Sequence, residues 1–182
     1  QHLKDSNLNY VGAGCDGTEA EAPYITTLGD TKIALLAYTE FYKGAHATDD
    51  RAGMSHYDMD LIAERVQDLK ENQGVDVVMV SMHWWEEYLD RAPERIVGLG
   101  QELVDMGVDV VIGHHPHVDQ EIERYGDGWI IYSLGNFVFD QSWSEETMQG
   151  LLAEIQIQNK QVYDIIPRPI QLNENYQPYL VK

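Results

Sequence analysis

The chain has 182 residues and a formal net charge of −19, from 12 basic and 31 acidic residues, and 43% of its residues are hydrophobic. That composition is typical of a globular domain with a real core, and the acidic excess argues against nucleic acid or an anionic membrane surface as a partner, because both are bound through clustered Lys and Arg. No apolar run approaches the roughly 20 residues that cross a bilayer, so we expect no signal segment and no membrane anchor within these residues.

The hydrophobic pattern of the first half of the chain predicts short strands followed by one helix. In chain order the elements are the end of a helix and a turn at 1–9, a short strand at 10–14, strands at Tyr24–Leu28 and Lys32–Thr39, and a surface loop at 41–57. Asp58 or Asp60 is expected to cap a helix that runs to about Asn72, with Gly74 just past its end. That helix would bury the face formed by Leu61, Ile62, Val66 and Leu69.

The second half of the chain predicts the buried strands of a parallel sheet. The elements are strands at 75–81, 108–113 and 129–133, a helix at 93–106, and a closing antiparallel pair at 151–158 and 162–166. The first two strands and the helix between them form a βαβ unit with a right-handed crossover. Because these strands are nearly continuous apolar runs, both faces of the sheet should be covered, and the fold class is α/β.

Polar side chains with metal-binding or catalytic chemistry occur where the expected strands end. They are His83 after the first strand, His114, His115 and His117 after the second, and Ser133 and Asn136 at and after the end of the third. In open α/β sheets, ligands bind beyond the carboxyl ends of parallel strands. We therefore expect a site at this edge of the sheet. The alternative is that these are loop histidines without a shared function.

The clustering of the histidines favours a divalent metal ion, for which neutral imidazole is the commonest protein ligand. His115 and His117 are two apart, which in an extended segment puts both side chains on one side, and Pro116 stiffens the backbone between them. Two of the three clustered histidines are expected to bind the metal directly, while the third contacts substrate or orients a ligand. His83 can supply a further ligand.

Further candidates come from the segments around these histidines. Glu86 or Glu87 could act as a general acid or base or orient an imidazole, and the alternative is a polar surface loop. Trp84 and Trp85 could form a pocket wall, although core packing is the commoner use of Trp. Asn136 could coordinate a metal or donate a hydrogen bond to a substrate oxygen, and the alternative is a turn residue.

Several segments taken together resemble a known family. They are YVGAGCDGTEAEAPYI followed by KIALLAYT, then VSMHWWEEY, VDVVIGHHPHV and IIYSLGNFVFDQ. This set resembles the CapA family of bacterial capsule synthesis proteins, which is linked to poly-γ-glutamate and is similar to the calcineurin-like metallophosphoesterases. The resemblance runs from about residue 8 to about residue 180. It implies a metallophosphoesterase-like sandwich of mixed β-sheets flanked by helices, with residues 1–182 as a single domain.

Two family motifs can be followed residue by residue. The His-Trp-Gly-x-Glu-Tyr motif is matched by His83, Trp84, Glu87 and Tyr88, with Trp85 in place of the glycine. The Gly-His-His-Pro-His motif is intact at residues 113–117. The substitution of the glycine by Trp85 is expected to narrow or reshape the pocket.

The resemblance also implies roles for the candidate residues. The implied metal ligands are His83, His115 and His117. The implied catalytic residues are His114 and Glu87, and the implied substrate contacts are Asn136, Ser133 and Trp84. The expected cofactor is a pair of divalent ions in the full domain, for which manganese, iron and zinc fit equally.

One departure from the family pattern concerns the start of the domain. The family domain opens with a strand that ends in Gly-Asp, followed by an Asn-His segment, and both supply metal ligands. This sequence does not open in that way. We therefore expect the chain to be the C-terminal two-thirds of the family domain, without its first strands and helices, and to need the missing N-terminal segment as a partner. Alone, it is expected to bind metal weakly or not at all and to be inactive.

Three readings of function remain open. The leading one is a capsule or poly-γ-glutamate biosynthesis protein with a metal-dependent hydrolase-like site, acting on an anionic polymer such as poly-γ-glutamate or on a phosphoester. The alternatives are a non-catalytic scaffold or polymer-binding subunit of a capsule synthase complex, and a generic metallophosphodiesterase. The resemblance further implies a location in the cell envelope or at the extracellular face of the membrane, beside other capsule synthase subunits.

Overall fold

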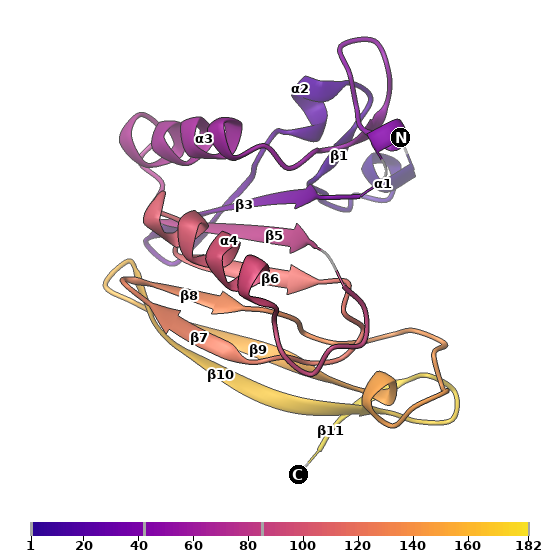
Figure 1. The fold of residues 1–182 in the computed structure, drawn as a ribbon. Coiled ribbons are helices and arrows are strands. Elements are labelled where there is room, and N and C mark those ends of the chain that lie inside the picture. The colour runs from indigo at the N-terminus through magenta and orange to yellow at the C-terminus, as the bar shows by residue number, and fades with distance from the viewer. Residues whose placement is uncertain (1, 42, 85, 182) are drawn as a thin grey trace.

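The computed structural model describes residues 2–41, 43–84 and 86–181, and its centre is a mixed sheet of six strands (Figure 1). In sheet order these are β2 (Tyr24–Leu28), β3 (Thr31–Thr39), β5 (Val77–His83), β6 (Val110–His114), β8 (Gly128–Ile131) and β7 (Ile122–Tyr125). Strands β3, β5, β6 and β8 run parallel, while β2 and β7 pair antiparallel at the two edges. The predicted parallel βαβ unit is therefore confirmed.

The strands of that unit lie slightly further along the chain than predicted. Strand β5 ends at His83 rather than at Ser81, and β6 ends at His114. Both strands begin just after an aspartate, because Asp76 and Asp109 use their carboxylates to bind the backbone of the neighbouring strand. Strand β7 is not among the predicted strands, because its sequence IERY is short and half of it is charged.

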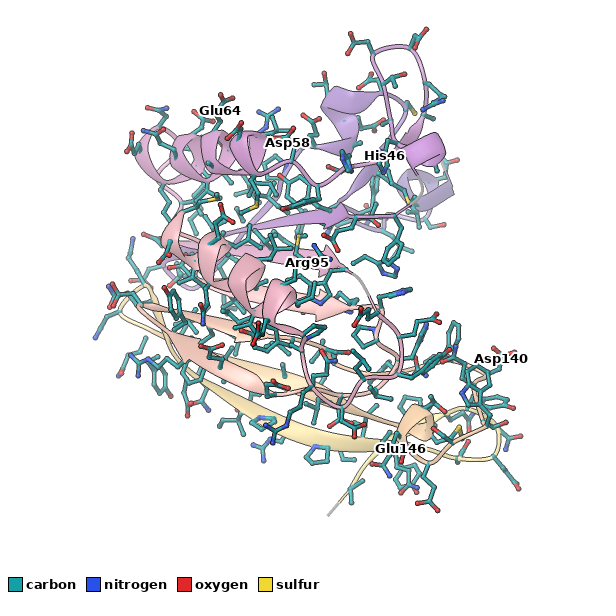
Figure 2. The ribbon with its side chains drawn as sticks, viewed as in Figure 1. His46, Asp58, Glu64, Arg95, Asp140 and Glu146 are labelled. Atoms are coloured by element: carbon teal, nitrogen blue, oxygen red, sulfur yellow. The ribbon has the colours of Figure 1, made fainter. Side chains whose placement is uncertain are left out.

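Helices α3 (Met59–Glu71) and α4 (Glu94–Asp105) cover one face of the large sheet (Figure 1). Asp58, labelled at the start of α3 in Figure 2, caps this helix by accepting a hydrogen bond from the Leu61 N–H over 3.2 Å. The core under the helices includes Ile62, Val66, Leu69, Ile96, Leu99 and Leu103. None of the helices in the described part of the chain is both long and apolar enough to cross a membrane.

A three-stranded antiparallel sheet covers the opposite face of the large sheet. It consists of β9 (Gln149–Gln158), β10 (Gln161–Leu172) and β11 (Pro178–Leu180). A second core lies between the two sheets and includes Val77, Val110, Ile131, Val162 and Ile165. The predicted closing pair is confirmed, but β10 continues beyond the predicted end at residue 166, through Pro167 and Pro169, to Leu172. The result is the expected α/β sandwich flanked by helices, in which the central sheet is mixed and the second sheet is antiparallel.

Short elements pack beside the carboxyl end of β3. They are α1 (His2–Asp5), β1 (Ala13–Gly14), α2 (Gly17–Ala20), η1 (Lys43–Ala45) and β4 (Gly53–Met54). One further short helix, η2 (Glu146–Met148), lies elsewhere, directly before β9. Strand β1 pairs with β4, and the Ser55 N–H donates to the Gly12 carbonyl over 2.9 Å. The predicted surface loop at 41–57 is therefore partly structured, and it closes one end of the pocket described next.

Candidate metal centre

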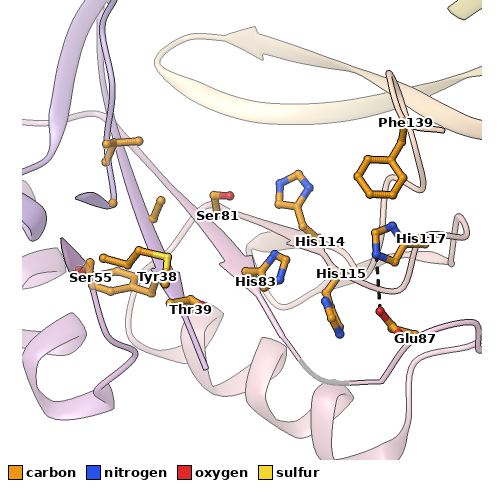
Figure 3. A pocket seen from close by; sticks show the side chains of 14 residues that line it. Tyr38, Thr39, Ser55, Ser81, His83, Glu87, His114, His115, His117 and Phe139 are labelled. Carbon is orange, nitrogen blue, oxygen red and sulfur yellow. Dashed lines mark ion pairs between the residues drawn. The ribbon is translucent and has the colours of Figure 1, made fainter. Parts of the chain in front are cut away.

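Neighbouring parallel strands end at the same level and bring histidines together (Figure 3). In the strand register, Thr39 is the partner of His83, and His83 is the partner of His114. Each of these residues is the last one of its strand. His83 and His114 are thus held by the sheet itself, rather than by the loops that were predicted to carry them.

His115 and His117 lie in the bend that follows β6, and their backbone differs from the predicted extended form. Both have positive φ angles, 103° for His115 and 61° for His117, which are uncommon for residues other than glycine. Their rings nevertheless converge, with centroids 5.8 Å apart. The carbonyl of Pro116 accepts a hydrogen bond from the Tyr88 N–H over 2.9 Å, which fixes the bend. Strained backbone of this kind is concentrated at functional sites.

A carboxylate completes a group of three possible metal ligands. The ligand atoms of Glu87, His115 and His117 all lie within 4.8 Å of one another. The closest approach to the carboxylate is from His117, whose Nε2 lies 3.7 Å from Glu87 Oε1. Two imidazoles and a carboxylate form a donor set suited to zinc, manganese or iron, so these residues fit a divalent ion. Of the two predicted glutamates, it is Glu87 that belongs to the group.

His83 lies beside this group without being part of it. Its ring centroid is 4.8 Å from that of His115, and the two rings meet edge to face. Phe41 packs against both, at 4.3 Å from His115 and 5.3 Å from His83. The ring of His46 supports this arrangement, because its Nε2 lies 2.8 Å from the Phe41 carbonyl. No pattern of residue types pointed to Phe41, since it lies more than 40 residues from His83 along the chain.

Burial keeps His83, His114 and His115 neutral. It lowers the pKa of His83 to about 4, with a smaller contribution from the neighbouring histidines His115, His114 and His117. Burial also lowers the pKa values of His114 and His115. At neutral pH each of these rings therefore carries a lone pair, which is the form of imidazole that binds metal ions.

His114 points away from the other two residues of its motif (Figure 3). It lines the same pocket as Ser81, which belongs to the neighbouring strand β5. The cavity has a volume of about 600 Å³, and its far end is lined by Val11, Ala37, Met54 and Ser55. None of the described residues that line it is Lys or Arg. The predicted catalytic role of His114 stays a prediction.

Two of the three predicted substrate contacts are buried in the protein and do not line the pocket. Trp84 is fully buried against the core, and its Nε1 donates to the Tyr132 carbonyl over 3.0 Å. Neighbouring side chains of an extended segment point to opposite faces of a sheet. Because His83 lies on the pocket side, Trp84, which follows it, lies on the helix side. Ser133 is buried too, and its Oγ accepts a hydrogen bond from the Gly135 N–H over 3.1 Å. Trp85 lies outside the described residues.

Asn136 is the third predicted substrate contact, and the structure places it against a histidine. Its side chain is buried, and its Oδ1 lies 2.9 Å from His117 Nδ1. Two aromatic rings flank the same histidine, Tyr88 at 5.9 Å and Phe139 at 5.1 Å between centroids. Phe139 and Tyr88 belong to segments that the resemblance had matched, but nothing in the sequence pattern indicated that their rings pack on His117.

Comparison with known sequences matches residues 1–141 to the family described as bacterial capsule synthesis protein PGA_cap. The chain is 34% identical over 174 residues to the capsule biosynthesis protein CapA of Bacillus anthracis, which is 93% of this chain and 42% of that protein. It is also 34% identical over 171 residues to the PGA biosynthesis protein CapA of Bacillus subtilis, which is 92% of this chain and 44% of that protein. The chain thus spans less than half the length of these relatives.

Solved structures with a similar fold include metallophosphoesterase-like enzymes. A 5'-nucleotidase precursor from Thermus thermophilus superposes with a TM-score of 0.53 at 13% identity, covering 97% of this chain and 36% of that chain. The sulfate thiohydrolase SoxB of Thermus thermophilus gives a TM-score of 0.55 at 15% identity, covering 82% of this chain and 24% of that chain. At these identities the likeness establishes the fold alone.

Proposed function

Because this chain belongs to the PGA_cap family of bacterial capsule synthesis proteins, we propose that it serves capsule synthesis through a divalent-metal hydrolase site at the carboxyl edge of its parallel strands. The observation that carries the proposal is the group formed by Glu87, His115 and His117, whose ligand atoms lie within 4.8 Å of one another. The location at this edge of an α/β sheet supports it further.

The residues of the group act as metal ligands in this proposal, and His83 lies beside them. His115, His117 and Glu87 would hold the ion, which when bound supplies Lewis acidity to polarise an oxygen of the substrate. His83 is close enough to His115 to serve as a further ligand. Glu87, which was expected to act as acid or base, is better placed as a ligand because it faces His117 Nε2.

His114 is then the candidate for proton transfer. Burial lowers its pKa, so the ring is neutral and its free nitrogen can accept a proton from an attacking water, and the imidazolium formed can then donate that proton to a leaving oxygen. Its position in the pocket, on the other side of the strand end from His115, leaves room for a substrate between the ligands and this ring.

The substrate that we propose is anionic, either a poly-γ-glutamate chain or a phosphoester. The relatives carry names that refer to capsule and PGA biosynthesis. The pocket offers no cationic side chain among its described lining residues, and the chain carries a net charge of −19. A bound dication would therefore be the local positive charge that holds such a substrate. Other capsule synthase subunits are the expected partners, in the cell envelope.

Metal content and hydrolysis can be measured together to test the proposal. The protein would be titrated with Zn²⁺ and Mn²⁺ by calorimetry and then assayed on bis(p-nitrophenyl) phosphate and on poly-γ-glutamate. Metal-dependent turnover that His115→Ala and His117→Ala abolish would support a hydrolase. Polymer binding without turnover in the metal-loaded full-length protein would instead favour the scaffold, and failure to bind either metal with the predicted N-terminal segment supplied would refute the metal centre.

A further inference from the structure

Asn136 touches His117 from a loop that follows a different strand. The hydrogen bond between Asn136 Oδ1 and His117 Nδ1 measures 2.9 Å and joins residues 19 apart in the sequence. Asn136 is 6% exposed, so its amide is shielded from solvent and has few partners to choose from. Its orientation decides which nitrogen of His117 carries the proton.

The orientation of the Asn136 amide follows from its other partners. Its nitrogen donates to the backbone carbonyl of Thr147 over 2.9 Å and to Gln141 Oε1 over 3.1 Å. A backbone carbonyl only accepts hydrogen bonds, so the NH₂ group must face Thr147. The amide oxygen then faces His117 and can only accept, which requires a proton on His117 Nδ1. The unprotonated nitrogen is Nε2, the atom that faces Glu87.

We propose that Asn136 is a positioning residue, which holds His117 in the Nδ1–H tautomer and so presents the Nε2 lone pair to the metal ion. The proposal rests on the proposed function for the ion itself, but the tautomer is a property of the chain alone. Hydrogen bonds of this kind to the second nitrogen of a metal-binding imidazole fix its tautomer and its ring orientation.

Buried side chains hold Asn136 in turn. Gln141 and Thr147 are 8% and 0% exposed, and Thr147 Oγ1 donates to the Gln141 carbonyl over 2.7 Å. Gln141 Nε2 donates to the Tyr88 hydroxyl over 3.2 Å. The Tyr88 ring stacks on His117 at 24°, so the series of contacts returns to the histidine from which it started. An Asn that served only as a turn residue would not require this set of buried partners.

The imidazole ¹⁵N chemical shifts of the metal-free protein at pH 8 report the tautomer directly. The wild type is expected to show a protonated Nδ1 at His117. Asn136→Ala removes the acceptor and should shift His117 toward the Nε2–H form. Asn173→Ala is the matched control, because Asn173 also bonds backbone groups, in the turn before β11.

Zn²⁺ titration of the same proteins adds the second readout. Asn136→Ala should weaken binding about 10- to 100-fold, and Asn173→Ala should stay within a few-fold of the wild type. A wild-type His117 in the Nε2–H form, or an unchanged tautomer in Asn136→Ala, would overturn the proposal, and the wild-type spectrum decides even if that variant does not fold. A wild type that shows the Nδ1–H tautomer but binds no Zn²⁺, even with the predicted N-terminal segment supplied, would support the tautomer assignment and refute the metal centre.

Discussion

His83 and His114 are register partners across the parallel strands β5 and β6, and each is the last residue of its strand. Their alignment is set at the opposite end of the sheet. There the Asp109 N–H donates to the Val78 carbonyl over 2.9 Å, and the Val78 N–H donates to Asp109 Oδ2 over 2.7 Å. Asp76 makes the same reciprocal pair of bonds with Lys32 of β3. The two VDVV segments therefore fix the register that brings the histidines together.

Replacing Glu87 by Gln should weaken metal binding more than about tenfold, because it removes a charged oxygen from the three-residue group. Glu86→Gln is the matched control, since it removes the same charge from the adjacent residue, which is exposed and outside the group. Calorimetric titration of both variants with Zn²⁺ checks the prediction. Equal losses in the two variants would mean that only the general negative charge of the loop matters.

Trp84→Ala should destabilise the fold by about 3–5 kcal/mol, because it empties a fully buried site in the core under the helices. The large effect follows from burial and would not be expected of a pocket wall. Trp143, which is 64% exposed, provides the control, and Trp143→Ala should change the free energy of unfolding by less than about 0.5 kcal/mol. Urea unfolding followed by circular dichroism distinguishes them, and similar midpoints would contradict the burial of Trp84.

The architecture could be predicted from the sequence because strands covered on both faces leave nearly continuous apolar runs, as at VDVVMVS and VDVVIG. The histidine edge could be predicted for a related reason, since residues after parallel strands gather at one edge. The choice between a pocket wall and core packing for Trp84 could not be made from the sequence, because it depends on where β5 ends. A strand that ended at Ser81 would leave Trp84 in a loop, whereas a strand that continues to His83 assigns it to the core face.

The contacts around His117 could not be predicted from the sequence either. Asn136 and Phe139 reach it from the segment after β8 and Tyr88 from the segment after β5, and their meeting depends on how the chain returns to the sheet after each strand. The positive φ angles of His115 and His117 give no signal in a pattern of residue types. The motif indicated which residues matter there, but the bend that makes them converge became visible only in the structure.

Gly113→Ala should be strongly destabilising, by about 3 kcal/mol or more, because a Cβ at Gly113 would lie 1.9 Å from the Tyr132 carbonyl oxygen and 2.6 Å from the Trp84 ring. This close approach explains why glycine opens the histidine motif. Gly98 in α4 is the control, since nothing lies within 4 Å of an added Cβ there. Gly98→Ala should raise stability by about 0.5–1 kcal/mol, and thermal unfolding of both variants tests the contrast.

Asp76 should make the stability of the fold depend on pH in the acid range. The backbone hydrogen bond from Lys32 holds the pKa of its carboxyl below the ordinary value, and Lys160 adds to this. The unfolded state then binds more protons than the folded state, so the free energy of unfolding falls as the pH drops below about 4 and through the folded-state pKa.

Two variants test this prediction, with urea unfolding measured from pH 7 to pH 2. Asp76→Asn should lose this part of the pH dependence. The difference in the free energy of unfolding between this variant and the wild type should therefore be constant above about pH 5 and become smaller in acid. Lys160→Met should keep most of it, because the bond from the Lys32 N–H at 2.8 Å is the larger cause and the Lys160 Nζ lies 3.3 Å away. If the free energy of unfolding varied with pH in parallel for the wild type and Asp76→Asn over the whole range, this carboxylate would not help to hold β3 and β5 in register.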